Sequence, residues 1–102
     1  MIRVVIKIDE SSEKITSIEA KGHSGKDVYG KDLVCAAVSA IVTGGFNALD
    51  PKGYDFLLDE GHAYAKSYSL PSDNDAVVLR TIYTQLQTVK EADPEFIKIE
   101  IL

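Results

Sequence analysis

The feature that most constrains the fold is an apolar run from Leu33 to Phe46 that carries no charged side chain. The run is too short to cross a bilayer, because a membrane helix needs about 20 apolar residues, and it contains Ser39 and two consecutive glycines. We therefore predict a helix from Leu33 to about Leu49 with Asp32 as its N-cap. Because it is apolar on nearly every side, we expect burial on more than one side.

The other segments mostly alternate between apolar and polar residues, which is the pattern of strands with one buried face. Residues 2–8 and 15–23 predict a hairpin in which Ile18, Ala20 and Gly22 share a face. Residues 54–59 and 63–70 predict a second pair of strands turned at residues 60–62, and residues 97–101 predict a last strand.

A second helix is predicted from the polar segment 71–75 to Pro94. Ser72 and Asp75 have the spacing of a capping box, with Asp in place of the usual Glu. The apolar stripe of this helix is formed by Val78, Ile82, Leu86 and Val89.

The resulting order is ββαββαβ, which predicts an α+β fold with a mostly antiparallel five-stranded sheet and two helices. We expect residues 1–102 to form one domain, because domains commonly have about 100–150 residues.

The composition excludes several classes of function. The net charge is −5 and the basic residues are scattered, which argues against direct nucleic-acid binding. One cysteine and two histidines without tight spacing do not suit a zinc site, and no cofactor fingerprint is present, so we expect neither metal nor cofactor. A single cysteine and an N-terminus unlike a signal peptide point to the cytoplasm, and no membrane association is expected.

Cys35 is the candidate nucleophile. With Asp32 as cap it would be the third helical residue, where unpaired amides and the helix dipole favour a thiolate. His23 is the candidate base, because the loop from Ser24 to Lys31 is long enough to bring it beside the helix start. A first-turn amide, that of Cys35 for example, would then be available to an oxyanion.

Each of these residues also has a simpler interpretation. A lone cysteine in an alanine-rich helix is often a small buried hydrophobe, and composition alone does not choose between the two. His62, the only other histidine, is expected to be exposed in a turn. Asp32 either caps the helix or orients His23. Ser39, on the same helical face as Cys35, either bonds back to the Cys35 carbonyl or hydrogen-bonds near the thiol.

The segment GHSGKDVYGKDLVCAAVS resembles the signature of the ribosomal-processing cysteine protease family, called Prp. That signature has a Gly-His pair, a loop with glycine, and then Gly-x-Asp-[Ile/Leu]-Val-Cys-Ala-Ala-Val-Ser. Every element is present, from Gly22 and His23 to Cys35 and Ser39, and the resemblance extends to the length of the chain and the order of its elements.

The resemblance implies a cytoplasmic cysteine endopeptidase that is generally a homodimer and removes the N-terminal extension of a large-subunit ribosomal protein. It implies that His23 and Cys35 are the catalytic pair, that Asp32 and Ser39 lie near the site, and that the loop moves over bound peptide. The substrate-binding loop is expected to include Gly22, Ser24, Gly25, Tyr29 and Gly30.

Two other classes of function stay open at this point. One is a non-catalytic ribosome-assembly or protein-binding module on the same fold, in which Cys35 belongs to the core. The other is a thiol hydrolase or transferase acting on a small acyl substrate, which needs a ligand pocket.

Overall fold

The fold is known from a computed structural model that describes residues 1–22 and 29–102, with side chains for residues 1–22 and 33–102. Its elements in chain order are β1 (Ile2–Ile8), β2 (Ile15–Lys21), α1 (Tyr29–Asn47), β3 (Tyr54–Asp59), β4 (His62–Ser67), α2 (Asp73–Ala92) and β5 (Ile97–Ile101). The predicted α+β class and the order ββαββαβ are confirmed.

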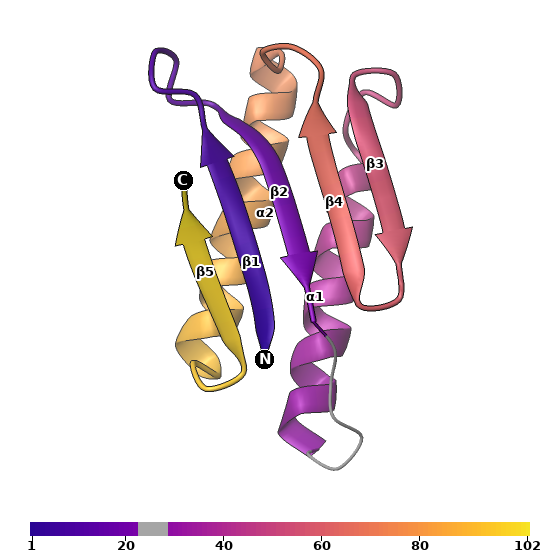
Figure 1. The fold of residues 1–102 in the computed structure, drawn as a ribbon, viewed down its shortest axis with the longest axis vertical. Coiled ribbons are helices and arrows are strands. Elements are labelled where there is room, and N and C mark those ends of the chain that lie inside the picture. The colour runs from indigo at the N-terminus through magenta and orange to yellow at the C-terminus, as the bar shows by residue number, and fades with distance from the viewer. Residues whose placement is uncertain (23–28) are drawn as a thin grey trace.

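The five strands form one sheet in the order β3-β4-β2-β1-β5, and both helices lie against the same face of it (Figure 1). Neighbouring strands are antiparallel except β1 and β5, which run parallel with Ile2 opposite Ile97. The prediction of a mostly antiparallel sheet is therefore confirmed.

The core lies between the sheet and the helices. Val4 and Ile6 of β1 pair with Ala20 and Ile18 of β2, and these four side chains are almost fully buried. Burial of a side chain of the size of isoleucine contributes about 1.5–3 kcal/mol relative to exposure. The alternation in β1 and β2 thus gives the sheet one apolar face for the helices to cover.

Helix α2 begins as predicted, with Ser72 as N-cap and its hydroxyl accepting a hydrogen bond from the Asp75 amide at 3.2 Å. The Asp75 carboxylate is buried and accepts from the Asp50 amide at 3.1 Å and from the Tyr54 hydroxyl at 2.9 Å. Burial raises the pKa of Tyr54, and the bond to Asp75 adds to this effect. The acidic residue of the expected capping box therefore joins α2 to β3.

The apolar stripe of α2 is wider than predicted. Ile82 and Leu86 are fully buried, whereas Val78 and Val89 are only partly buried. Leu79, outside the predicted stripe, is 0% exposed. A helix that packs on both a sheet and a second helix buries two neighbouring rows of side chains. The predicted stripe, at steps of three and four, included only one of these rows.

Three strand boundaries differ from the prediction. β2 ends at Lys21 and not at residue 23, and β4 begins at His62, which pairs with Lys21, so His62 is not a turn residue. β4 ends at Ser67, and the next predicted strand residues, Tyr68 and Leu70, are outside the sheet and exposed.

Helix α1 begins earlier than predicted. It starts at Tyr29, so Asp32 is its fourth residue and not its N-cap, and residues 29–31 are helical and not part of a loop. The prediction placed Gly30 in a loop because glycine allows loop conformations, and it started the helix after Asp32 because aspartate is a favoured N-cap. Inside a helix, however, glycine costs only about 1 kcal/mol relative to alanine. That cost is small enough for the additional helical hydrogen bonds to offset.

Burial of α1 is also different from the prediction. Val34, Val38, Val42 and Phe46, at steps of four, are its buried residues within the described side chains. On the other side Leu33 is 55% exposed, and Ala36, Ala40 and Gly44 are exposed as well. The expected burial on more than one side is therefore wrong for this chain, because the sheet and α2 cover only one side.

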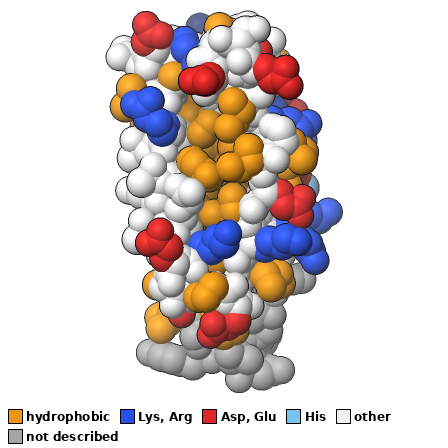
Figure 2. All heavy atoms as spheres, turned by 90° about the vertical axis from the view of Figure 1, so that its left-hand side faces the viewer, with side chains coloured by type: hydrophobic (Ala, Val, Ile, Leu, Met, Phe, Trp, Pro, Cys, Tyr) orange, Lys and Arg blue, Asp and Glu red, His pale blue; other side chains and the backbone are white. Residues whose placement is uncertain are grey.

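One edge of the sheet is formed by β5. Ile101 and the following Leu102 are 53% and 66% exposed, and Figure 2 shows hydrophobic side chains gathered on this side of the molecule. Among the described residues, neither helix is long and apolar enough to span a membrane.

Candidate active site

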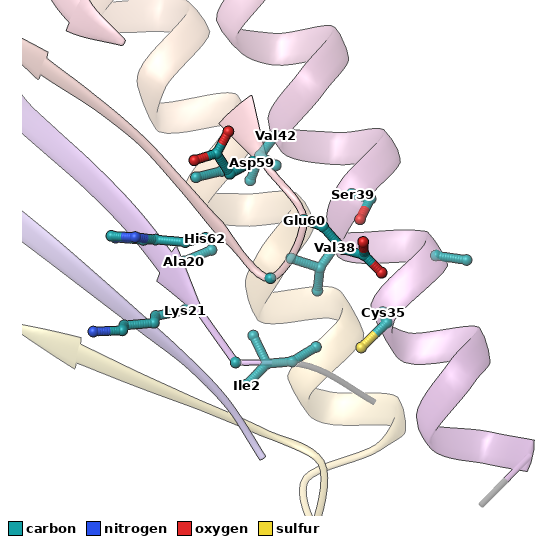
Figure 3. A pocket seen from close by; sticks show the side chains of 14 residues that line it. Ile2, Ala20, Lys21, Cys35, Val38, Ser39, Val42, Asp59, Glu60 and His62 are labelled. Carbon is teal, nitrogen blue, oxygen red and sulfur yellow. The ribbon is translucent and has the colours of Figure 1, made fainter. Parts of the chain in front are cut away.

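A cavity of about 240 Å³ lies where α1 passes the ends of the central strands (Figure 3). Helix α1 contributes Cys35 and Ser39 to its wall, β1 contributes Ile2, and Gly22 follows the end of β2. Asp59, the last residue of β3, and Glu60 and Gly61 of the turn to β4 form the opposite side. The cavity thus brings together residues from both ends of the signature segment.

Gly22 is fixed at the cavity by its backbone. Its N–H donates a hydrogen bond to the Gly61 carbonyl at 2.9 Å, which ties the end of β2 to the β3–β4 turn. Its φ is +128°, and a Cβ at this position would lie 2.4 Å from the Met1 carbonyl oxygen. Only glycine fits this combination of backbone conformation and close approach.

Cys35 is half-buried, and its sulfur points into the cavity toward Ile2 (Figure 3). It is the seventh residue of α1, because the helix starts at Tyr29. The helix-dipole effect falls off within the first turn, so the expected thiolate stabilisation by the helix start does not apply. An amide at this position bonds within the helix, so the Cys35 amide is not a free oxyanion donor either.

Ser39 lies one turn after Cys35 and lines the same cavity, as its spacing predicts. Threonines of α2 donate hydrogen bonds to carbonyls four residues back, Thr81 to Val77 for example. The Ser39 hydroxyl makes no such bond to Cys35 within the described part of the chain. Of the two roles considered for Ser39, the back-bond to the Cys35 carbonyl is therefore absent, and the hydroxyl faces the cavity.

The structure does not describe the side chains of the other predicted residues. His23, Ser24 and Gly25 lie outside the described residues. For Tyr29, Gly30 and Asp32 the helical backbone is described, but the side chains of Tyr29 and Asp32 are not.

His62 is bound on the opposite face of the sheet. Figure 3 shows its imidazole pointing away from α1, although its backbone borders the cavity. Its Nε2 lies 2.5 Å from the Glu19 carboxylate, and Lys66 lies 3.8 Å from the other Glu19 oxygen. The hydrogen bond from His62 lowers the pKa of Glu19. His62 is therefore not an exposed turn residue as predicted, and its ring points away from the thiol.

Glu60 is a residue of the cavity that the sequence interpretation missed. It lies in the β3–β4 turn, and Figure 3 shows its carboxylate directed toward α1, whereas that of Asp59 points away from Cys35. The sequence gives only an acidic turn before a glycine at this place, and its proximity to Cys35 follows from the pairing of β2 with β4. Among the described residues, no three His, Cys, Asp or Glu side chains are grouped so as to hold a metal ion.

Known proteins resemble this chain over its full length. A family model described as cysteine protease Prp matches residues 1–98. The ribosomal processing cysteine protease Prp of Staphylococcus aureus is 33% identical over 104 residues, which covers 97% of each chain. Crystal structures of the Prp protease from S. aureus also match, each with 100% of both chains covered. The complex with a substrate peptide has a TM-score of 0.88 at 30% identity, and the complex with a covalently linked product peptide has 0.86 at 32%.

Proposed function

Because the chain belongs to the cysteine protease Prp family, we propose that it is the endopeptidase that removes the N-terminal extension of a large-subunit ribosomal protein. The observation that carries this proposal is the cavity between α1 and the ends of the central strands, which is lined by Cys35 and by Gly22, the residue directly before His23 in the sequence. The peptide complexes of the S. aureus relative support a peptide substrate.

In the proposed mechanism, the Cys35 thiolate attacks the carbonyl carbon of the scissile peptide bond. The carbon–nitrogen bond breaks, and the His23 imidazolium protonates the leaving amine. Water, deprotonated by the neutral imidazole, then hydrolyses the thioester and releases the extension. Since α1 starts six residues before Cys35, activation of the thiol depends on His23 and not on the helix start.

Two further residues of α1 have proposed supporting roles. Ser39 faces the cavity, so its hydroxyl is available to a peptide group of the substrate beside the thiol. Asp32 is proposed to orient His23, because the other role considered for it, the helix cap, is not available to the fourth residue of a helix. Together with Gly22, the signature residues Ser24, Gly25, Tyr29 and Gly30 are proposed to bind the substrate backbone.

The experiment is incubation of the protein with the extended ribosomal-protein precursor under reducing conditions, followed by mass spectrometry of the products. We expect one cut near the N-terminus, and Cys35→Ser lowers the rate at least roughly 1,000-fold. An intact precursor would refute the proposal. It would then favour the non-catalytic module, above all if native Cys35 resisted alkylation.

A second measurement tests the pair itself. The rate of alkylation of Cys35 by iodoacetamide is followed between pH 5 and pH 9 in the wild type and in His23→Ala. We expect the substitution to slow alkylation at neutral and lower pH, because the imidazolium no longer stabilises the thiolate. Identical pH profiles would exclude the ion pair of Cys35 and His23.

The proposal includes a homodimer in the cytoplasm, where the ribosomal substrate is made. The surface that supports a dimer is the groove between α1 and α2, whose ten lining residues are all uncharged, among them Ala40, Gly44 and Val77. Light scattering with Ala40→Arg measures this directly. A charge in the groove is expected to give monomers, and a wild type that is monomeric at micromolar concentration would contradict the dimer.

A further inference from the structure

We infer that Glu60 determines specificity by binding a Lys or Arg side chain of the substrate peptide next to the scissile bond. The inference rests on the proposed endopeptidase function and adds to it a substrate preference and the residue that sets it. The position of Glu60, its lack of a partner among the described residues and its charge relative to Cys35 support this role.

The position of Glu60 is fixed by the fold. The β3–β4 turn is held against the end of β2 by the 2.9 Å hydrogen bond from Gly22 to Gly61. Glu60 and Cys35 line opposite walls of one cavity, and Figure 3 shows the Glu60 carboxylate directed across it toward α1. Glu60 is exposed, so its carboxylate lies at the rim, where a side chain of a bound peptide can reach it.

The carboxylate has no hydrogen-bond or ion-pair partner among the described side chains. The basic residues that border the cavity are directed elsewhere, since Lys21 and His62 point to the opposite face of the sheet in Figure 3. His62 is engaged with Glu19, whose carboxylate is also close to Lys66. Glu19 thus has two basic neighbours, whereas Glu60 has none within the described chain.

The charge of Glu60 has the wrong sign for activation of the nucleophile. A carboxylate near a thiolate disfavours the negative charge on sulfur, so it does not assist attack by Cys35. A positive group of a bound peptide would be stabilised by the same carboxylate and would reduce this repulsion. The net charge of −5 also favours the approach of basic peptides to this protein.

The test is a set of fluorogenic peptides that span the cut in the ribosomal-protein precursor. In these peptides each Lys or Arg near the bond is replaced, one at a time, by norleucine or by Glu. We expect Glu60→Gln to lower kcat/KM on the parent peptide by roughly three- to tenfold, mainly through KM, and to change it less than about twofold on one of the norleucine peptides. Glu60→Lys is expected to prefer the Glu-containing peptide at that same position.

The matched control is Asp59→Asn, which removes the same charge from the neighbouring residue, whose carboxylate points away from Cys35. It should cut the parent and norleucine peptides in the wild-type ratio. Peptide affinity is also measured by calorimetry in a Cys35→Ser background, where the loss caused by Glu60→Gln should appear only for the basic peptide. This separates binding from any effect on the thiol or imidazole.

The outcomes separate this inference from the proposed function. If the wild type cuts the peptides but Glu60→Gln loses the same factor on every one of them, Glu60 acts on the catalytic groups and the specificity role is overturned. If Asp59→Asn reproduces the selective loss, the effect is general charge attraction and Glu60 has no specific role. If the wild type cuts none of the peptides, the proposed function fails and this inference fails with it.

Discussion

The two helices pack on the same sheet but differ in chemistry. Helix α2 has a serine N-cap, Asp73 and Asp75 in its first turn and Lys90 in its last, all of which suit the helix dipole. Helix α1 has no basic residue in its last turn and no charged residue between Leu33 and Asn47. The difference indicates that α2 is built for stability, whereas α1 carries the candidate nucleophile and an uncharged surface.

The two helices also contribute differently to the contact between them. Gly45 of α1 lies so close to α2 that an added Cβ would be 2.4 Å from Cγ1 of Ile82, whereas one at Gly44 would meet nothing within 4 Å. A large buried side chain on α2 therefore packs against bare backbone on α1. Substitutions in α2 should change stability, and those in α1 should depend on which side they face.

The largest effect on stability is expected for Leu79→Ala in α2. Leu79 is 0% exposed, and truncation of a buried leucine costs about 2–5 kcal/mol of unfolding free energy. Urea denaturation measures this loss. If α2 acts only as scaffold, kcat/KM of the folded variant should stay close to the wild-type value, and a large drop would show that the two helices are not separable in function.

The next effect compares the neighbouring glycines of α1. Gly45→Ala forces the buried Ile82 side chain to move, which costs about 1–3 kcal/mol, and the better helix propensity of alanine offsets up to about 1 kcal/mol of that. Gly44→Ala has the propensity gain without the clash, so we expect it to stabilise the folded chain. Thermal unfolding of both variants shows the difference, and equal melting temperatures would contradict the close contact of α1 with α2.

A smaller effect is expected at the start of α2. Ser72→Ala removes the acceptor of the Asp75 amide and should cost about 1 kcal/mol, whereas Ser72→Asp keeps an acceptor and should stay near the wild type. Urea titrations of the two variants measure the difference. Similar losses in both would show that the hydroxyl does not act as a cap acceptor.

The smallest effect concerns the face of the sheet that neither helix covers. The pKa of Glu19 is lowered in the folded chain, mainly by its hydrogen bond with His62. A lowered carboxyl pKa stabilises the fold above the ordinary value of 4.5, and this contribution is lost as pH falls through the folded value.

We therefore expect Glu19→Gln to cost at most about 1 kcal/mol at pH 6, and the difference from the wild type to shrink below pH 4.5. Urea unfolding at several pH values checks the sign. A difference that grew on acidification would show that Glu19 does not gain stability from this pair.

The sequence predicted the parts of the molecule that depend on local pattern. Strands β1 and β5 and the Ser72 cap follow from alternation and from one side-chain acceptor. The predicted start of α1 was wrong because Gly30 and Asp32 are typical of helix boundaries, although neither prevents a helix from continuing. Cys35 and Ser39 were expected to share a face, which their common cavity confirms, but Glu60 reaches it through strand pairing that no local pattern reports.

The parallel pairing of β1 with β5 joins the first strand of this chain to its last, with Ile2 opposite Ile97. Contacts between residues so distant in sequence form late and slow folding. Ile2 of β1 also lines the cavity of Cys35. Strand β1 has a neighbouring strand on both sides only after residues 97–101 have left the ribosome. We therefore expect a nascent chain lacking β5 to expose Cys35 to alkylation without cutting peptide, so that the pairing of β5 with β1 is itself a condition for activity.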